Sequence, residues 1–345
     1  MTANPLRHLL VTGGAGFIGS AFVRQRLRAE PELRITVLDK LTYAGSRENL
    51  AEVEGNPRFA FVHGDICDRE AVGPIAKEVD AIVNFAAESH VDRSLLEAGE
   101  FVQTDVRGTL VLLEAARRHG HQRFLQVSTD EVYGHVGEGH SREGDALLPR
   151  SPYSATKAGA EMLVHAYHAS YGVPTLITRG SNTYGPHQFP EKIIPLFITN
   201  ALEDLPLPIY GDGSAVRDYL YVDDHVSAIA AVLAKGEPGS AYNVGAGAEI
   251  SGVAVADAVL ELCAKAASLK HFVNDRPGHD YRYALDASRI SSLGWKARVP
   301  FGEGLRRTVD WYRENQAWWK RRKAKEFWEF YQRNYRGLPS RAIPE

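Results

Sequence analysis

This chain has few cysteines, no long apolar run and no large excess of charge of one sign. Its 345 residues include two cysteines, Cys67 and Cys263, which lack the spacing of a metal or redox site and are expected to be reduced. The formal net charge of −3 provides no general basic field for nucleic acid. No run approaches a membrane span, and residues 1–5 lack the apolar core of a signal peptide. These absences predict a cytoplasmic protein that binds no metal, nucleic acid or membrane.

A glycine-rich segment follows the first predicted strand. Leu9–Val11 has the composition of a buried strand, and Gly13, Gly16 and Gly19 come directly after it in the segment Thr-Gly-Gly-Ala-Gly-Phe-Ile-Gly. This spacing is typical of a phosphate-binding loop, where glycine lets the backbone approach a pyrophosphate at a helix N-terminus. The glycines could instead serve only helix–strand packing, but an amphipathic helix follows at once, as a dinucleotide site requires.

An acidic residue ends the second predicted strand. Asp39 follows Ile35–Leu38 and lies 20 residues after Gly19. A carboxylate at this point accepts hydrogen bonds from both ribose hydroxyls and repels a 2′-phosphate, so the sequence predicts NAD rather than NADP as the cofactor. Lys40 beside it would soften that repulsion.

Strand and helix patterns alternate through the first half of the chain. This alternation predicts an α/β fold built on a Rossmann-type doubly wound parallel sheet, with a smaller C-terminal substrate-binding lobe. Residues 1–180 are expected to form the NAD-binding domain and residues 181–345 mainly the substrate domain, with some segments returning to the sheet. The predicted strands are His8–Val11, Arg34–Leu38, Phe59–His63, Ala81–Phe85, Arg123–Ser128, Pro174–Thr178, Leu207–Tyr210 and Tyr219–Val222, and the main predicted helices are Phe101–His119, Ser151–Tyr171 and Ile193–Leu202.

The fifth predicted strand leads into the residues that carry the chemistry. Tyr153 and Lys157 are four residues apart and therefore share one face of a helix. A nearby cation favours the phenolate, so Tyr153 is expected to act as a base near neutral pH. Thr129, Asp130 and Glu131 add a hydroxyl, an acid and a base at the strand end. This combination predicts elimination of water in addition to hydride transfer.

Several long strings of residues together resemble the dTDP-glucose 4,6-dehydratases, a family of the extended short-chain dehydrogenase/reductase superfamily. The glycine loop and the Tyr/Lys pair define only the superfamily, whereas the Thr-Asp-Glu triplet and the Ala-Ala-Glu-Ser-His string are more specific. The resemblance runs from about residue 7 to about residue 315. The strings are those at 12–19, 39–45, 86–94, 128–134, 189–195 and 275–280.

The resemblance implies NAD-dependent conversion of a nucleotide-activated glucose, dTDP-glucose before others, to the 4-keto-6-deoxy sugar nucleotide of deoxysugar biosynthesis. Tyr153 would take the proton of the C4 hydroxyl while hydride passes to NAD. Glu131 would then remove the C5 proton, and Asp130 would protonate the departing C6 hydroxyl. Hydride returns to C6 and C5 is reprotonated. Thr129 would bind the C4 oxygen, and Lys157 would hold the nicotinamide ribose.

The same resemblance assigns further contacts. Arg217 and Arg276 suit a diphosphate because a guanidinium offers forked donors, although each could instead form a surface salt bridge. The expected cofactor contacts are Gly13, Gly16, Phe17, Ile18, Gly19, Asp39, Lys40, Leu41, Thr42, Asp65, Ile66, Phe85, Ala86, Ala87, Glu88, Thr104, Tyr153, Lys157 and Thr183, with Asp65 and Ile66 along the adenine. The expected substrate contacts are Ser89, Thr129, Asn182, Lys192, Ile193, Pro208, Ile209, Tyr210, Arg217, Asn243, Asp275, Arg276, Pro277, Gly278 and His279.

The chain departs from the family pattern at four positions near the expected site. Asp105 stands where the family usually has asparagine, and Thr183 and His187 stand in a segment that usually reads Asn-Asn-Tyr-Gly-Pro-Tyr. Tyr219 replaces the commoner tryptophan. These changes keep the reacting groups but leave the nucleotide base and the sugar open.

Two other functions compete with the dehydratase. A nucleotide-sugar 4-epimerase needs the Tyr/Lys pair but not the carboxylates, so Asp130 and Glu131 argue against it. A non-catalytic dinucleotide-sensing protein could discard Tyr153 or Lys157, and this chain has both.

Two features concern assembly and partners. By analogy with similar enzymes, the predicted helices at 101–119 and 151–171 are expected to pair with their copies in a homodimer, although both could be buried within one chain. Five aromatic residues near the C-terminus accompany a basic run at 321–325, and they predict either an amphipathic helix packed on the second lobe or a surface for a partner or an anionic ligand. The aromatic residues are Trp311, Trp318, Trp319, Trp328 and Tyr331.

Overall fold

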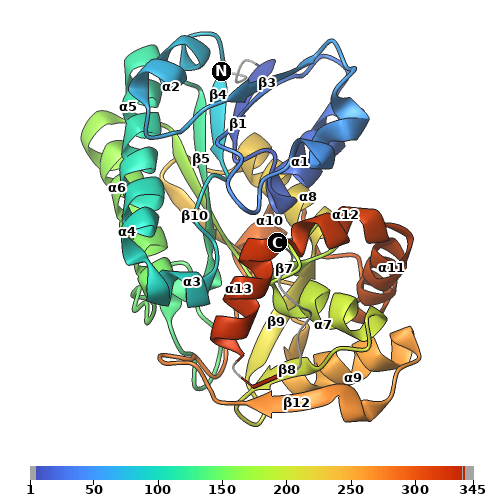
Figure 1. Ribbon diagram of the computed structural model, residues 1–345. Coiled ribbons are helices and arrows are strands. Elements are labelled where there is room, and N and C mark those ends of the chain that lie inside the picture. Colours follow the sequence, from blue (N-terminus) through green and yellow to red (C-terminus); the bar gives the residue numbers. More distant parts are fainter. Residues whose placement is uncertain (1–4, 336, 339–345) are drawn as a thin grey trace.

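The computed structural model describes residues 5–335 and 337–338, and it places seven strands in one parallel sheet (Figure 1). The strand order is β10-β6-β5-β4-β1-β2-β3. Because β1 pairs with β2 on one side and with β4 on the other, the chain reverses direction across the sheet at this point, where α/β sheets bind ligands. The strands are β1 (His8–Thr12), β2 (Arg34–Asp39), β3 (Phe59–His63), β4 (Ala81–Asn84), β5 (Arg123–Thr129), β6 (Thr175–Gly180) and β10 (Ser240–Val244).

Successive side chains of β1 point to opposite faces of the sheet and so build two apolar cores. Leu9 and Val11 belong to the core that contains residues of α1 (Phe17–Ala29) and α8 (Val222–Lys235). Leu10 lies in the other core, which is closed by α2 (Arg69–Ala76), α5 (Thr109–His119) and α6 (Pro152–Tyr171). Figure 1 shows α5 and α6 side by side on one flank of the sheet and α1 and α8 on the other. The predicted Rossmann-type fold is confirmed.

Local signals in the sequence fix where α6 begins and ends. Ser151 and Ser154 form a reciprocal capping box at its start, and Pro152 occupies the first turn, where its missing N–H has no cost. Gly172, in a left-handed conformation at φ 68°, ends the helix. These boundaries place Tyr153 in the first turn, close to the end of β5.

The predicted helix Phe101–His119 is interrupted in the structure. It begins as α4 (Ala98–Phe101), continues as the π-helix η2 (Val102–Gly108) and becomes regular only in α5. A π-turn adds a residue to the helical cycle and occurs often at functional sites. Here the widened turn contains Asp105, whose carboxylate accepts hydrogen bonds from the backbone N–H of Glu88 at 3.0 Å and the hydroxyl of Thr156 at 2.9 Å.

The second lobe consists of two small sheets and several helices. β9 joins β7 and β11 in one sheet, and β8 pairs with β12 in the other. The predicted strand Tyr219–Val222 in fact ends one residue earlier, because Val222 begins α8. From this half of the chain β10 pairs with β6 of the main sheet, while the division at residue 180 stays a prediction. The elements are β7 (Asn182–Tyr184), α7 (Ile193–Leu202), β8 (Leu207–Tyr210), β9 (Val216–Tyr221), β11 (Glu249–Ser251), α9 (Gly252–Cys263), β12 (Lys270–Val273), α10 (Ser288–Ser292) and α11 (Phe301–Glu314).

The aromatic C-terminal segment folds into α11, α12 (Gln316–Arg322) and α13 (Lys325–Asn334) rather than one helix. It contacts both halves: the indole N–H of Trp318 donates to Asn49 Oδ1 at 3.1 Å, and buried Lys323 donates to Asn200 Oδ1 at 2.8 Å. Shorter elements are η1 (Arg47–Val53), α3 (Val91–Leu96), η3 (Asp130–Tyr133) and η4 (Ala267–Leu269). Within the described residues no helix is long and apolar enough to cross a membrane.

Candidate active site

Two adjoining cavities lie at the carboxyl ends of the strands. The first, here called the dinucleotide cavity, is lined by every expected cofactor residue except Leu41, whose side chain packs on the core beside it. The second, here called the substrate cavity, is lined mainly by the smaller lobe. The two cavities share Ser89, Glu131, Asn182 and Lys192 among their lining residues. A molecule in one cavity can therefore meet a molecule in the other.

The glycine loop forms one wall of the dinucleotide cavity and leaves no room for side chains. Gly13 has a φ of +66°, and a Cβ there would lie 2.5 Å from the backbone nitrogen of Ala86. A Cβ on Gly19 would press into the carbonyl of Gly13. This close backbone cradle fits the pyrophosphate of a dinucleotide.

The carboxylate of Asp39 is held in the same cavity by two backbone donors, the N–H groups of Ala15 and Leu41, each at 2.8 Å. Each carboxylate oxygen retains capacity to accept another hydrogen bond, which suits two ribose hydroxyls. The ammonium of Lys40 lies 2.9 Å from Asp65 and is paired with it. Lys40 therefore does not leave an uncompensated cation beside Asp39, and the site favours NAD.

The Thr129–Glu131 triplet turns away from β5 as the start of η3. The hydroxyl of Thr129 accepts from the backbone N–H of Glu131 and donates to Asp130 Oδ1, both at 3.2 Å. Thr129 thus caps the turn and orients the two carboxylates. Thr129, Asp130, Glu131, Tyr153 and Lys157 all line the dinucleotide cavity, and Glu131 also lines the substrate cavity.

The two carboxylates have different electrostatic surroundings. Burial, with the charges of Glu131 and Asp218, raises the pKa of Asp130 well above its usual range, and its Oδ2 has no hydrogen-bond partner among the described residues. Burial also raises the pKa of Glu131, but Arg276, Arg217 and Lys192 act in the opposite direction. Asp130 is thus suited to hold a proton, and Glu131 to accept one.

The surroundings of Tyr153 differ from the expectation. Burial, with Glu131, Asp105 and Asp130, raises the pKa of Tyr153 well above its ordinary value. The ammonium of Lys157 donates to the carbonyl of Val127 at 2.8 Å, and burial lowers its own pKa. The role of Tyr153 as a base stays a prediction, and in the protein by itself burial and these carboxylates act against ionisation of the phenol.

Asp105 adds a further titratable group to this wall. Its side chain is only 1% exposed, and burial raises its pKa to about 7 against the opposing effects of Lys157 and the hydrogen bonds from Thr156 and Glu88. The asparagine usual in the family would carry no charge here. This chain therefore has an ionisable group whose charge acts on both Lys157 and Tyr153.

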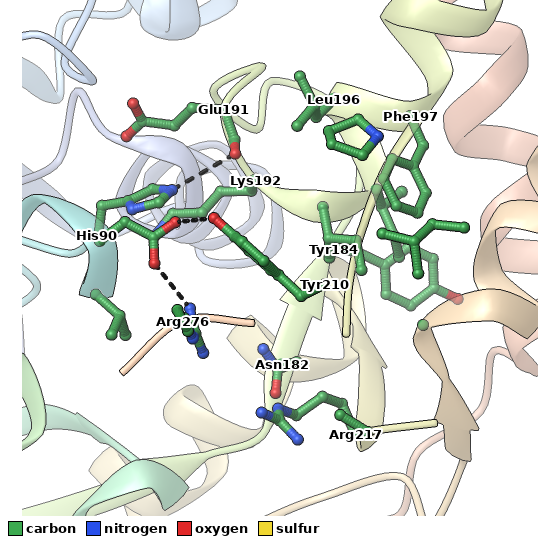
Figure 2. A pocket seen from close by; sticks show the side chains of 18 of the residues that line it. His90, Asn182, Tyr184, Glu191, Lys192, Leu196, Phe197, Tyr210, Arg217 and Arg276 are labelled. Carbon is green, nitrogen blue, oxygen red and sulfur yellow. Dashed lines mark hydrogen bonds and ion pairs between the residues drawn. The ribbon is translucent and has the colours of Figure 1, made fainter. Parts of the chain in front are cut away.

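Basic and aromatic side chains surround the substrate cavity (Figure 2). Arg276 lies 3.2 Å from the carboxylate of Asp92, and its buried Nε has no hydrogen-bond partner in the part of the chain that the structure describes. The guanidinium of Arg217 donates to the carbonyls of Val216 and Asp280. Both arginines are anchored on one side and remain able to bind phosphate oxygens on the other. The ion pair of Arg276 with Asp92 is largely buried and does not lie on the surface, and the binding of a diphosphate by the two arginines stays a prediction.

Four expected substrate residues lie outside both cavities. Asn243 is fully buried, and its side chain bonds Tyr133, Ser141 and Asp286. Asp275 pairs with His279, which does line the substrate cavity, at 2.6 Å. Pro277 and Gly278 complete the same loop. The roles of these residues stay predictions.

The lining residues that were not singled out from the sequence include His90, Asp92, Glu191 and His225. His90 and Asp92 lie in the family-like string at 86–94, so a signal for them was present. Glu191 lies in the family-like string at 189–195, so a signal for it was present as well, whereas His225 had no comparable signal, because it becomes part of the site only through folding. The ring of His225 bonds the hydroxyl of Thr183 at 2.7 Å, and burial lowers its pKa to about 4, so it is neutral. The described residues hold no cluster of three potential metal ligands.

Known proteins resemble this chain through both lobes. The family model described as GDP-mannose 4,6 dehydratase matches residues 10–308. A dTDP-glucose 4,6-dehydratase from an Actinoplanes species is 49% identical over 317 residues, which cover 90% of this chain and 99% of the relative.

Solved structures show the same similarity. DesIV, a dTDP-glucose 4,6-dehydratase from Streptomyces venezuelae with NAD and dTDP bound, has a TM-score of 0.90 and 50% identity, covering 92% of this chain and 100% of its own. A UDP-glucose 4-epimerase from Thermus thermophilus, in complex with NAD, has a TM-score of 0.82 and 35% identity, covering 89% of this chain and 99% of its own. Similarity of this extent shows that this chain belongs to the dTDP-glucose 4,6-dehydratase family of NAD-dependent enzymes.

Proposed function

We propose that this protein converts dTDP-glucose to the 4-keto-6-deoxy sugar nucleotide, using the residues that surround the junction of the two cavities. The observation that carries the proposal is the pair Asp130 and Glu131 beside Tyr153. One carboxylate is buried, and one of its oxygens has no hydrogen-bond partner within the described residues, whereas the other carboxylate interacts with three cationic side chains. Such a pair provides an acid and a base for elimination of water.

Each residue has a defined task in this proposal. Tyr153 accepts the proton of the C4 hydroxyl, while Thr129 holds the C4 oxygen. NAD, when bound, supplies the hydride acceptor and donor and a positively charged ring that favours the tyrosinate. Glu131 removes the C5 proton, which the 4-keto group has made acidic, and returns one at the end. Asp130 protonates the C6 hydroxyl as it leaves. Arg217 and Arg276 bind the diphosphate, and Lys157 binds the nicotinamide ribose.

A 4-epimerase is the alternative with the same fold. Its chemistry requires Tyr153 and Lys157 but does not use a protonated Asp130. In an epimerase, burial of this carboxyl group would destabilise the fold without serving the reaction. The dehydratase therefore explains one more feature of the site than the epimerase does.

A panel of nucleotide-glucoses tests the proposal. Purified protein is incubated with dTDP-, UDP- and GDP-glucose without added NAD, and products are identified by mass and by the absorbance of the 4-keto sugar in base. We expect loss of water from dTDP-glucose and the least from GDP-glucose, with cofactor already bound, because the hydride leaves and returns in one turnover. Formation of dTDP-galactose instead would contradict the proposal, as would a parallel incubation with NAD in which product forms only as the added NAD is consumed stoichiometrically.

We also propose that the enzyme works in the cytoplasm as a homodimer. Cys67 and Cys263 are unpaired, as in a reducing compartment. Exposed apolar side chains gather on α3, η2 and α6, where α3 and η2 each contact α6. They include Leu95, Leu96, Val102 and Met162. Such a surface suits pairing with a second copy of the chain.

A further inference from the structure

The aromatic C-terminal segment reaches the half of the molecule that holds the dinucleotide cavity. Helix α12 lies next to η1, the short helix that follows β2, and in Figure 1 the red α12 adjoins the blue N-terminal half. The indole N–H of Trp318 donates to Oδ1 of Asn49 at 3.1 Å. Asn49 is only 2% exposed, so water does not compete for this bond. The segment therefore does not pack on the second lobe alone.

Asn49 connects this contact to the glycine loop. Its Nδ2 donates to the carbonyl of Ala15 at 2.9 Å, and Ala15 is fully buried within the loop. The same carbonyl accepts one further bond, from the N–H of Ser46 at 3.0 Å. The N–H of Ala15 donates to Asp39 at 2.8 Å. Both backbone polar groups of Ala15 are therefore held, one by the expected ribose ligand and the other largely by Asn49.

The ring of Trp318 is fixed by contacts on two sides. The guanidinium of Arg322 lies 3.7 Å from the ring centroid and pairs with Glu48, in η1, at 3.2 Å. His187 packs edge-on against Trp318, with ring centroids 5.6 Å apart. The backbone of His187 is left-handed, at φ 68°, and the next residue, Gln188, lines both cavities. These contacts set the direction of the indole N–H.

We infer that Trp318 is a positioning residue of the dinucleotide site: through Asn49 it holds the glycine loop in shape and so slows the release of NAD. Backbone N–H groups bind a pyrophosphate tightly only when they are held in fixed directions, and hydrogen bonds from behind the loop hold them. Neither Asn49 nor Trp318 lines a cavity, so NAD can enter the site without them but is retained less firmly. This role requires NAD as the cofactor and is the same for any sugar nucleotide.

Retention of NAD tests the inference, with the neighbouring tryptophan as the matched control. Purified holoenzyme is passed over a desalting column, and the NAD that stays with the protein is measured over time. Trp318→Phe keeps an aromatic ring beside His187 and Arg322 but removes the N–H donor. We expect this variant to lose NAD roughly tenfold faster than the wild type, the equivalent of one buried hydrogen bond.

Trp319→Phe removes the same group from the same helix at a site remote from the glycine loop. The N–H of Trp319 donates to the carbonyl of Tyr312 at 2.8 Å, and its side chain is fully buried. Both variants should melt at a lower temperature than the wild type, because each leaves a buried acceptor without its donor. Only Trp318→Phe should lose NAD faster. Its turnover should fall after desalting and return when excess NAD is added, which a general weakening of the fold would not produce.

Asn49→Ala provides the second arm and remains informative if Trp318→Phe does not fold. It should lose NAD at least as fast as Trp318→Phe, because the carbonyl of Ala15 then loses the amide donor directly. The double variant should be no faster than Asn49→Ala, since the tryptophan acts through the asparagine.

Wild-type retention of NAD by folded Trp318→Phe or by folded Asn49→Ala would overturn the inference. Equal loss of NAD from Trp319→Phe, or additive effects in the double variant, would overturn it as well. The retention assay contains no sugar nucleotide, so its outcome is separate from that of the proposed dehydration of dTDP-glucose.

Discussion

At the scale of single residues, Glu131 and Asp130 can be separated by experiment. Glu131→Gln keeps the size and polarity of the side chain but removes a base. Oxidation at C4 should survive, whereas removal of the C5 proton should fail. Mixing the variant with dTDP-glucose should therefore build up the absorbance of reduced nicotinamide on the enzyme, with little product and little solvent deuterium at C5.

Two variants serve as controls for that experiment. Asp130→Asn lacks the acid for the C6 hydroxyl, so exchange at C5 should persist while loss of water slows. Tyr153→Phe should show no reduced nicotinamide and should lose about two to four decades of turnover. Wild-type exchange at C5 in Glu131→Gln would show that another group is the base.

Asp105 allows a prediction about pH. Burial raises the pKa of Asp105 to about 7 in the folded protein. Between the ordinary pKa of an aspartate and pH 7, the folded protein therefore binds a proton that the unfolded chain does not. The free energy of unfolding falls as the pH rises through this window. Asp105→Asn has no such titration. We expect the variant to melt a few degrees above the wild type at pH 8, with the difference closing toward pH 4.

The same variant should also shift the pH dependence of turnover. The charge of Asp105 raises the pKa of Tyr153, so its removal should move the acidic limb of the kcat profile to lower pH. Identical melting curves and identical pH profiles would show that Asp105 is not ionised in the working range.

The types of the residues and their spacing in the sequence were sufficient to predict the reacting groups. They were not sufficient to predict the protonation states of those groups. Tyr153 and Lys157 were located from a spacing of four, yet the direction of the tyrosine pKa depends on burial and on Asp105, Glu131 and Asp130 together. Long-range partners such as the bond between Asn334 and Asp92 also have no local signal, because the two residues are 242 positions apart.

At the scale of elements, the glycine loop makes the clearest prediction. A Cβ on Gly19 would meet the backbone of Gly13 and Gly14, which cannot yield without moving the loop. We expect Gly19→Ala to purify with little bound NAD, measured as cofactor released on denaturation. Gly73→Ala, on α2 with open space around the added methyl, is the control and should keep its cofactor. Equal cofactor content in the two variants would show that the loop does not form the dinucleotide site.

Regular helices and strands were predicted from the sequence, whereas interruptions of helices were not. β3 and α7 were predicted with their observed bounds because apolar runs and turn residues mark them. The π-helix η2 was missed because its apolar spacing still resembles a helix, and only the hydrogen bonds of Asp105 to Glu88 and Thr156 reveal why the turn widens. The C-terminal segment was predicted as one helix because its breaks depend on contacts with both lobes.

At the scale of the whole molecule, the proposed dimer is open to direct measurement. Light scattering at micromolar concentration should give about twice the 38.1 kDa of one chain. Met162→Glu places a charge in the apolar surface of α6 and should yield a monomer. Phe272→Glu, equally exposed but on β12, should leave the mass unchanged. A wild-type monomer would refute the homodimer.

The position of α13 beside the substrate cavity also affects the order in which the two cavities form while the chain is being synthesised. A chain emerges from the ribosome from its N-terminus, and early parts fold first. Among the described residues, the lining of the dinucleotide cavity ends at His225, whereas that of the substrate cavity extends to Tyr335. A nascent chain can thus complete the dinucleotide lining well before the ribosome has made the last wall of the substrate cavity. We therefore expect that the cofactor can be acquired before the first sugar nucleotide can bind.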